Sequence, residues 1–176
     1  MDMEKALQEN ERKAQHPVEG TWFMVEPATI NHELFYEERK DSRQEWTRKM
    51  IFKVLKKNEY VRSFETMIPE KAWERGRNVK QLKEIAKKVG GQIATFDEQV
   101  LEWAQRISNG ETWEEVCNKP DTSKWYRLVL ERNGSTILVG ACHEFNISNS
   151  STDFLPFVGN IENPLSYVVP LVVRYK

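Results

Sequence analysis

The sequence lacks most of the features that assign a chemical activity directly. Its 176 residues include only two cysteines and three histidines, and these are too scattered to give a metal-ligand spacing. It contains no phosphate-binding glycine loop, no dinucleotide fingerprint, no nucleophile-elbow motif and no zinc-protease motif. These absences predict a protein without a metal, a cofactor or a set of catalytic residues.

Excess charge and long apolar runs are lacking as well. The net charge is −1, so no overall field attracts nucleic acid or an anionic membrane, and we expect neither as a partner. No stretch approaches the roughly 18 consecutive apolar residues of a membrane span, and Met1–Lys5 lacks the apolar core of a secretory signal. We therefore expect a cytoplasmic protein in which Cys117 and Cys142 are reduced thiols rather than a disulfide.

The sequence does contain an amphipathic segment with clear helix-start and helix-end signals between residues 79 and 107. Apolar residues recur there with helical spacing in two stripes, namely Val79, Leu82, Ile85, Ala86 and Val89, then Val100, Leu101, Ala104 and Ile107. Gly90-Gly91 separates the stripes, because glycine accepts the left-handed backbone at a helix end. The run 92–95 between them is short and mostly apolar. The segment therefore predicts a helix, a strand and a second helix, with both apolar stripes in the core.

Residues that cap helix starts support this order. Asn78 is placed to cap the first helix, and Thr95 with Glu98 forms a capping box at the start of the second. Thr112 and Glu115 repeat the same pattern. They predict a further short helix.

Strands are predicted on both sides of this segment. The run 21–25 is a single strand, whereas the runs 50–55 and 60–64 favour a hairpin, although the first of these two could also be helical. The run 167–173 predicts a final strand, in which Pro170 indicates an edge or a bulge.

The clearest hairpin surrounds Asn133-Gly134, the preferred residue pair for a two-residue type I′ turn. Counting outward from that turn places Leu130 opposite Ile137 and Leu128 opposite Val139. This register predicts a wholly apolar face that belongs to the core.

The segment Ile85–Val100, IAKKVGGQIATFDEQV, resembles a characteristic segment of the C-type-lectin-like fold. It is also similar to the corresponding part of the formylglycine-generating enzymes. The density of Asn and Ser from Asn146 to Asn163 resembles the lectin-like loop surface of the variable proteins made by diversity-generating retroelements. The resemblance implies an α+β fold, with two helices against a small, mostly antiparallel sheet and a long irregular loop. It also implies a lectin-like domain over residues 49–176, preceded by an N-terminal helical extension with one strand over residues 1–48.

The chain departs from these relatives where they carry chemistry. It has too few cysteines for the paired disulfides of extracellular lectin-like domains, and only Glu162-Asn163-Pro164, in scrambled order, approaches their calcium-binding triplet. The active-site cysteine arrangement of the formylglycine-generating enzymes is not recognisable. Separately, the stretches Thr112–Asp121 and Lys124–Val129 resemble uncharacterised phage or prophage proteins, which implies a phage or prophage origin but no particular activity.

The stretch 146–164 loses all periodicity and is the main candidate for a functional surface. Loops of this length in a compact domain are commonly functional. Three apolar residues with polar neighbours have the composition of a protein contact; the candidate binding residues are Asn146, Asn149, Phe154, Leu155, Phe157 and Asn160. The alternative interpretation is that these aromatic residues belong to the core.

These observations predict a non-catalytic protein-binding module. The resemblance to phage or prophage proteins implies that it is encoded by a phage or prophage and acts on a host protein, such as a component of a defence system. One alternative is a lectin-fold enzyme of the formylglycine-generating type, which would need a pocket with convergent polar groups. Another is a structural or receptor-binding component of a virion.

Two basic features have a functional and a simpler interpretation. The segment Trp73–Arg77 combines aromatic and basic residues, as in contacts to phosphate or nucleic acid, but such a segment is more often a loop with an arginine lying over a tryptophan. Lysines also line one side of the first predicted helix, at Lys80, Lys83, Lys87 and Lys88. The simplest interpretation of that row is a solvated helix face.

Overall fold

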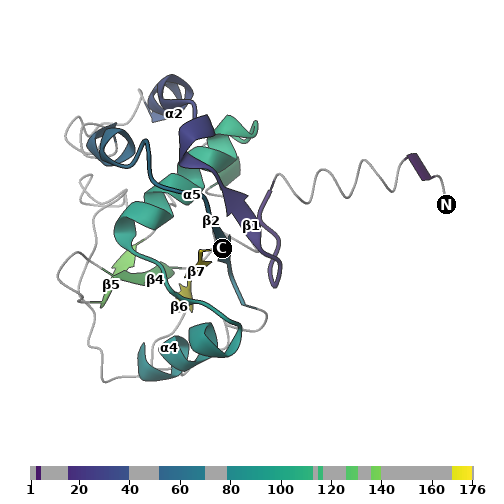
Figure 1. The fold of residues 1–176 in the computed structure, drawn as a ribbon, viewed down its shortest axis with the longest axis vertical. Helices are drawn as coiled ribbons and strands as arrows, with labels where there is room; N and C mark the ends of the chain where they lie inside the picture. The colour runs from purple at the N-terminus through teal and green to yellow at the C-terminus, as the bar shows by residue number, and fades with distance from the viewer. Residues whose placement is uncertain are drawn as a thin grey trace.

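A computed structural model describes residues 3–4, 16–39, 52–69, 79–112, 115–116, 126–130, 136–139 and 168–175 (Figure 1). The helical elements in these ranges are η1 (Pro27–Thr29), α2 (His32–Arg39), α4 (Val79–Lys88) and α5 (Phe96–Ser108), together with residues 3–4, 52–57 and 115–116. The strands are β1 (Phe23–Val25), β2 (Phe64–Met67), β3 (Gln92–Ile93), β4 (Tyr126–Leu130), β5 (Thr136–Val139), β6 (Val168–Pro170) and β7 (Val172–Arg174). The protein therefore has an α+β fold, as predicted.

The larger sheet joins segments from both ends of the sequence. Its strand order is β1-β2-β7-β3, and every neighbouring pair is antiparallel. Phe23 of β1 lies opposite Thr66 of β2, and Thr66 in turn lies opposite Val173 of β7. The strand predicted at residues 21–25 is thus present, and it belongs to the same sheet as strands from the second half of the chain.

The C-terminal strand differs from the prediction because it is two strands. Leu171 separates β6 from β7 and is fully buried, and its carbonyl accepts a hydrogen bond of 2.8 Å from the Ala94 N–H. β6 pairs with β4 in parallel at the end of the three-stranded sheet β5-β4-β6, whereas β7 lies inside the larger sheet. Pro170, which has no N–H to donate, accordingly lies on an edge strand of the described sheet.

The hairpin of β4 and β5 is present, but its predicted register is wrong by one residue. Leu128 lies opposite Leu138 and Leu130 lies opposite Thr136. This register requires an odd number of connecting residues, whereas the predicted two-residue turn requires an even number. A shift of one residue exchanges the cross-strand partners on each face. The predicted pairing of leucines with Ile137 and Val139 therefore does not form.

The hairpin predicted at residues 50–64 is wrong, and the helical alternative for its first half is confirmed. Residues 52–57 are helical, and β2 begins at Phe64. Val54 and Leu55 are both buried, which a half-exposed strand cannot achieve because neighbouring side chains point to opposite faces. The Asn58 side chain donates a hydrogen bond of 2.8 Å to the Val54 carbonyl at the end of the helix.

The two predicted amphipathic helices are confirmed, together with most of the residues that delimit them. Gly90 has φ +94, the left-handed conformation expected after α4. The Thr95 side chain accepts from the Glu98 N–H and the Glu98 carboxylate accepts from the Thr95 N–H, so the capping box is complete. Thr112 and Glu115 form the same reciprocal pair. Asn78, Cys117 and Cys142 lie outside the described residues.

Helix α5 occupies the centre of the molecule, with α4 toward one end and α2 toward the other (Figure 1). Residues 98–107 of α5 are all buried, including every polar residue among them. α4 buries only one face, where Leu82 and Ala86 pack with Ile93 and Val172. The apolar stripe of α5 thus faces the main core as predicted, but its polar side is covered as well.

Among the described residues, no helix is both long and apolar enough to cross a membrane.

Candidate functional site

The six binding residues predicted from the sequence are Asn146, Asn149, Phe154, Leu155, Phe157 and Asn160, and all of them lie outside the described residues. Their role therefore stays a prediction. The described residues present two other polar or concave features, a buried ion cluster on α5 and a groove beside α2.

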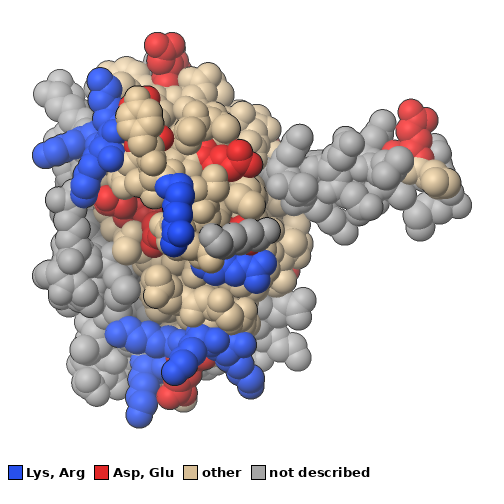
Figure 2. Space-filling model, viewed as in Figure 1, with Lys and Arg blue, Asp and Glu red and all other residues tan. Residues whose placement is uncertain are grey.

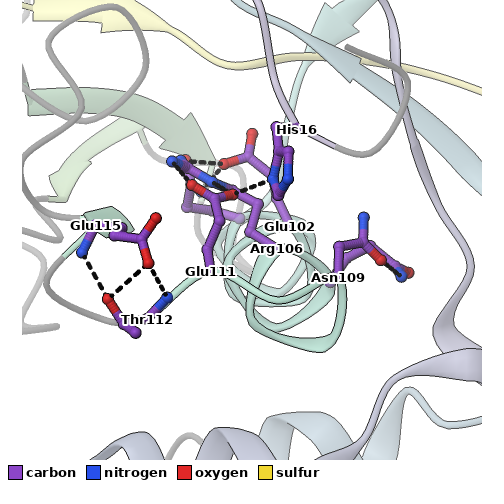
Figure 3. A network of polar contacts seen from close by, with 9 residues as sticks. His16, Glu102, Arg106, Asn109, Glu111, Thr112 and Glu115 are labelled. Carbon is purple, nitrogen blue, oxygen red and sulfur yellow. Dashed lines mark hydrogen bonds and ion pairs between the residues drawn. The ribbon is translucent and has the colours of Figure 1, made fainter. Parts of the chain in front are cut away.

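The buried ion cluster is centred on Arg106, whose side chain is fully buried (Figure 3). Its Nε and Nη2 donate to the two oxygens of Glu111, at 2.8 and 3.0 Å. Its Nη1 lies 3.9 Å from Glu102, one turn earlier on α5. A guanidinium can remain charged in the interior only with such partners, because an unpaired buried charge is costly.

Two further side chains extend the cluster. His16 places Nδ1 3.2 Å from Glu111, and Gln99 donates a hydrogen bond of 3.2 Å to Glu102. The cluster therefore joins α5 to Glu111 in the turn after it, and the His16 side chain lies beside it. Both Glu111 oxygens accept a hydrogen bond from Arg106, so this carboxylate is the counter-ion of the buried guanidinium. The geometry supports an architectural role.

A second polar contact holds the end of β7 against the start of α5. The Tyr175 hydroxyl donates a hydrogen bond of 2.5 Å to Glu98, the same carboxylate that closes the capping box. Burial, the hydrogen bond to Glu98 and the charge of Glu98 all raise the pKa of Tyr175, whereas the Arg62 guanidinium over its ring lowers it. Tyr175 is therefore a neutral donor at physiological pH.

The concave feature is a groove of about 540 Å³ between α2 and the helix at residues 52–57. It is lined by Glu33, Tyr36, Glu37, Phe52 and Lys53. The Tyr36 and Phe52 rings meet edge to face, with centroids 5.6 Å apart, and Tyr36 remains 43% exposed. An exposed aromatic surface is thus bordered by charges of both signs.

Both walls of the groove are fixed to α5. On the α2 side, Asn31 accepts from the Leu34 N–H as an N-cap, and its own N–H donates a hydrogen bond of 2.7 Å to Ser108. On the opposite side, Asn58 donates a hydrogen bond of 3.1 Å to Asp97 at the start of α5. Because the two walls are held at opposite ends of one buried helix, the groove is preorganised.

The sequence pattern around α2 does not by itself identify this groove. Leu34, Phe35 and Tyr36 form the aromatic and apolar run, in which Phe35 is fully buried whereas Leu34 and Tyr36 are exposed. Helical spacing could have separated Phe35 from its neighbours. Phe52, the other half of the aromatic pair, was assigned to a strand, so no sequence signal placed it beside Tyr36.

Within the described ranges, no group of three His, Cys, Asp or Glu side chains is placed to hold a metal ion. Comparison with protein-family models, with curated proteins and with solved structures found no match to this chain. Fold and site together define an α+β protein with a buried ion cluster and an open aromatic groove.

Proposed function

We propose that this protein is a non-catalytic binding module for another protein, built on a lectin-like scaffold and acting in the cytoplasm. The observation that carries the proposal is the groove beside α2, where the half-exposed Tyr36 packs on Phe52. Tyrosine is enriched among the residues that dominate protein interfaces, especially when it lies in a pocket surrounded by polar residues. The chemistry of the groove fits a partner that inserts an apolar side chain against this aromatic pair.

The charges around the groove add specificity. Glu33 and Glu37 lie on the α2 side and Lys53 on the opposite side. A partner must therefore place a basic group toward α2 and an acidic group toward the other wall, and rim charges of this kind act mainly on association rate and partner choice. The loop residues Phe154 and Phe157 are proposed as a second contact to the same partner. The resemblance to phage proteins supports a host protein as that partner.

A matched pair of tyrosine variants tests the groove. Tyr36→Ala removes the exposed ring from the groove, whereas Tyr60→Ala removes an 89% exposed ring that does not line it. Wild-type and variant proteins are immobilised, exposed to an extract of the native host, and compared by quantitative mass spectrometry. A protein retained by wild type and by Tyr60→Ala, but not by Tyr36→Ala, is then purified.

The affinity of the purified partner gives the decisive measurement. We expect Tyr36→Ala to raise Kd by about 30-fold or more, which corresponds to about 2 kcal/mol. Tyr60→Ala is expected to leave Kd unchanged. Equal affinity for wild type and Tyr36→Ala would overturn the groove assignment, and a double Phe154→Ala, Phe157→Ala variant with unchanged affinity would overturn the second contact.

A further inference from the structure

The outer face of α4 concentrates positive charge on a chain whose net charge is close to zero. The helix contains four lysines and one glutamate within ten residues. Lys80, Lys83, Lys87 and Lys88 are all exposed, and the structure gives none of them a carboxylate partner among the residues that it describes. Figure 2 shows the resulting group of basic side chains over α4, at one end of the molecule.

The arrangement of these lysines follows from the way in which α4 packs. At 3.6 residues per turn, Lys80, Lys83 and Lys87 fall within an arc of about 60°. That arc faces away from Leu82 and Ala86, which are buried against β3 and β7. These three lysines therefore share one exposed surface, with Glu84 beside them on the helix.

We propose that this lysine face is a binding surface for the phosphate backbone of a nucleic acid, recognised without regard to sequence. Phosphate groups are contacted mainly by lysine and arginine, and such contacts position a protein without reading bases. Lys80 and Lys88 are separated by about 12 Å along the helix axis. A DNA duplex of that length carries about seven phosphates on its two strands, more than the number of lysines on this face.

The composition of this lysine face favours nucleic acid over an acidic protein surface and over an anionic membrane. A protein interface needs an apolar core, and lysine is depleted there, but the apolar side of α4 is already buried. A membrane-binding helix likewise needs a free apolar face. The sequence just before α4 also contains Lys71, Arg75 and Arg77. These residues lie outside the described residues and are not part of the proposed surface. The near-zero net charge of the chain is therefore compatible with a local cationic surface on α4.

The test measures binding of a fluorescein-labelled 25-mer, as duplex and as single strand, by fluorescence anisotropy between 50 and 200 mM salt. We expect a Kd on the order of 10⁻⁵ M near 100 mM salt, with no preference between two unrelated sequences. With three to four phosphate contacts, duplex affinity should fall by about 40- to 150-fold across that salt range. No binding at 50 mM salt overturns the proposal.

Paired charge-removal variants locate the surface. Lys83→Gln with Lys87→Gln removes two charges from α4, and Lys56→Gln with Lys57→Gln removes two from the exposed side of the helix at 52–57. We expect the first pair to lower affinity at 50 mM salt at least about tenfold and to reduce the salt slope by about two units. The second pair should change affinity less than about twofold, because a distant exposed charge is largely screened.

Two further outcomes would contradict the assignment. Equal losses in both variants would show that the total charge, and not α4, attracts the nucleic acid. Poly-L-glutamate that displaces the labelled DNA as well as unlabelled DNA does, at equal charge concentration, would assign the face to an acidic protein instead. Circular dichroism and thermal unfolding confirm that each variant keeps its fold.

Discussion

Helices α4 and α5 begin from the same kind of sequence pattern and end in opposite environments. Both have an apolar stripe with helical spacing and a polar remainder. The polar side of α4 is exposed and carries lysines without a carboxylate partner among the described residues, whereas the polar side of α5 is covered and carries Arg106 with its carboxylate partners. Whether a polar helix face is exposed or buried thus depends on what the rest of the chain packs on it. A charge on a buried face must be neutralised within the protein, whereas a charge on an exposed face remains available to a ligand.

The largest expected effect comes from removing the buried charge on the polar side of α5. Arg106→Ala leaves Glu102 and Glu111 without their buried counter-charge, and we expect the free energy of unfolding to fall by about 3–5 kcal/mol. Urea denaturation followed by circular dichroism measures the change. The control is Lys83→Ala on α4, expected to stay within about 0.5 kcal/mol of wild type. A loss below about 1 kcal/mol for Arg106→Ala would contradict the role assigned to the cluster.

The next effect concerns the close packing behind α4. A Cβ added at Gly91 would lie 2.5 Å from Val172 Cγ1 and 2.7 Å from the Val173 carbonyl oxygen. Because the carbonyl belongs to the backbone of the central strand β7, we expect Gly91→Ala to cost about 1–3 kcal/mol. Gly90→Ala meets no atom within 4 Å but strains a residue at φ +94, and it should cost about 1 kcal/mol. Thermal unfolding that ranks Gly90→Ala as the more damaging change would refute this packing argument.

A smaller effect tests the start of α5. Thr95→Ala removes the side-chain acceptor for the Glu98 N–H and should lower the free energy of unfolding by about 1 kcal/mol. Thr95→Ser keeps that acceptor and serves as the control. If both variants match wild type in urea denaturation, the capping box contributes nothing measurable to the stability of α5.

The smallest effect is a pH dependence at the same end of α5. The folded protein raises the pKa of Tyr175, so its contribution to stability is fully present below the ordinary tyrosine pKa of about 10 and is lost as pH rises beyond it. We expect wild type to lose stability above about pH 10 more steeply than Tyr175→Phe, which cannot ionise. Identical slopes of the unfolding free energy against pH in the two proteins would exclude this contact as the cause.

Local patterns in the sequence were sufficient for much of the fold. The helix ends at Gly90 and Thr95 were predictable because capping depends on residues within one turn of each other. The apolar stripes of α4 and α5 were predictable from spacing alone. Helical and extended interpretations of residues 50–55 were both compatible with the local pattern, and contacts with distant segments selected the helix.

The parts that could not be predicted depend on contacts between distant residues. His16 and Glu111 are 95 positions apart, and no spacing rule joins them. The same applies to the groove, in which Tyr36 and Phe52 come from separate elements. The hairpin register was wrong because a favourable dipeptide, Asn133-Gly134, was assumed to determine the turn length. The candidate site among the described residues is therefore built by α2 and the helix at residues 52–57, which composition did not indicate.

The central position of β7 has a consequence for the order of events during synthesis. β2 and β3 each pair with β7 and not with one another, so the larger sheet stays in two pieces until residues 172–174 have left the ribosome. The ribosome synthesises α4, α5 and the walls of the groove before β7. The apolar surface that packs on β7 is therefore uncovered during that time. Non-local pairing of this kind slows folding and leaves hydrophobic surface transiently open. The apolar surface that packs on β7 therefore stays exposed until this strand has paired with β2 and β3.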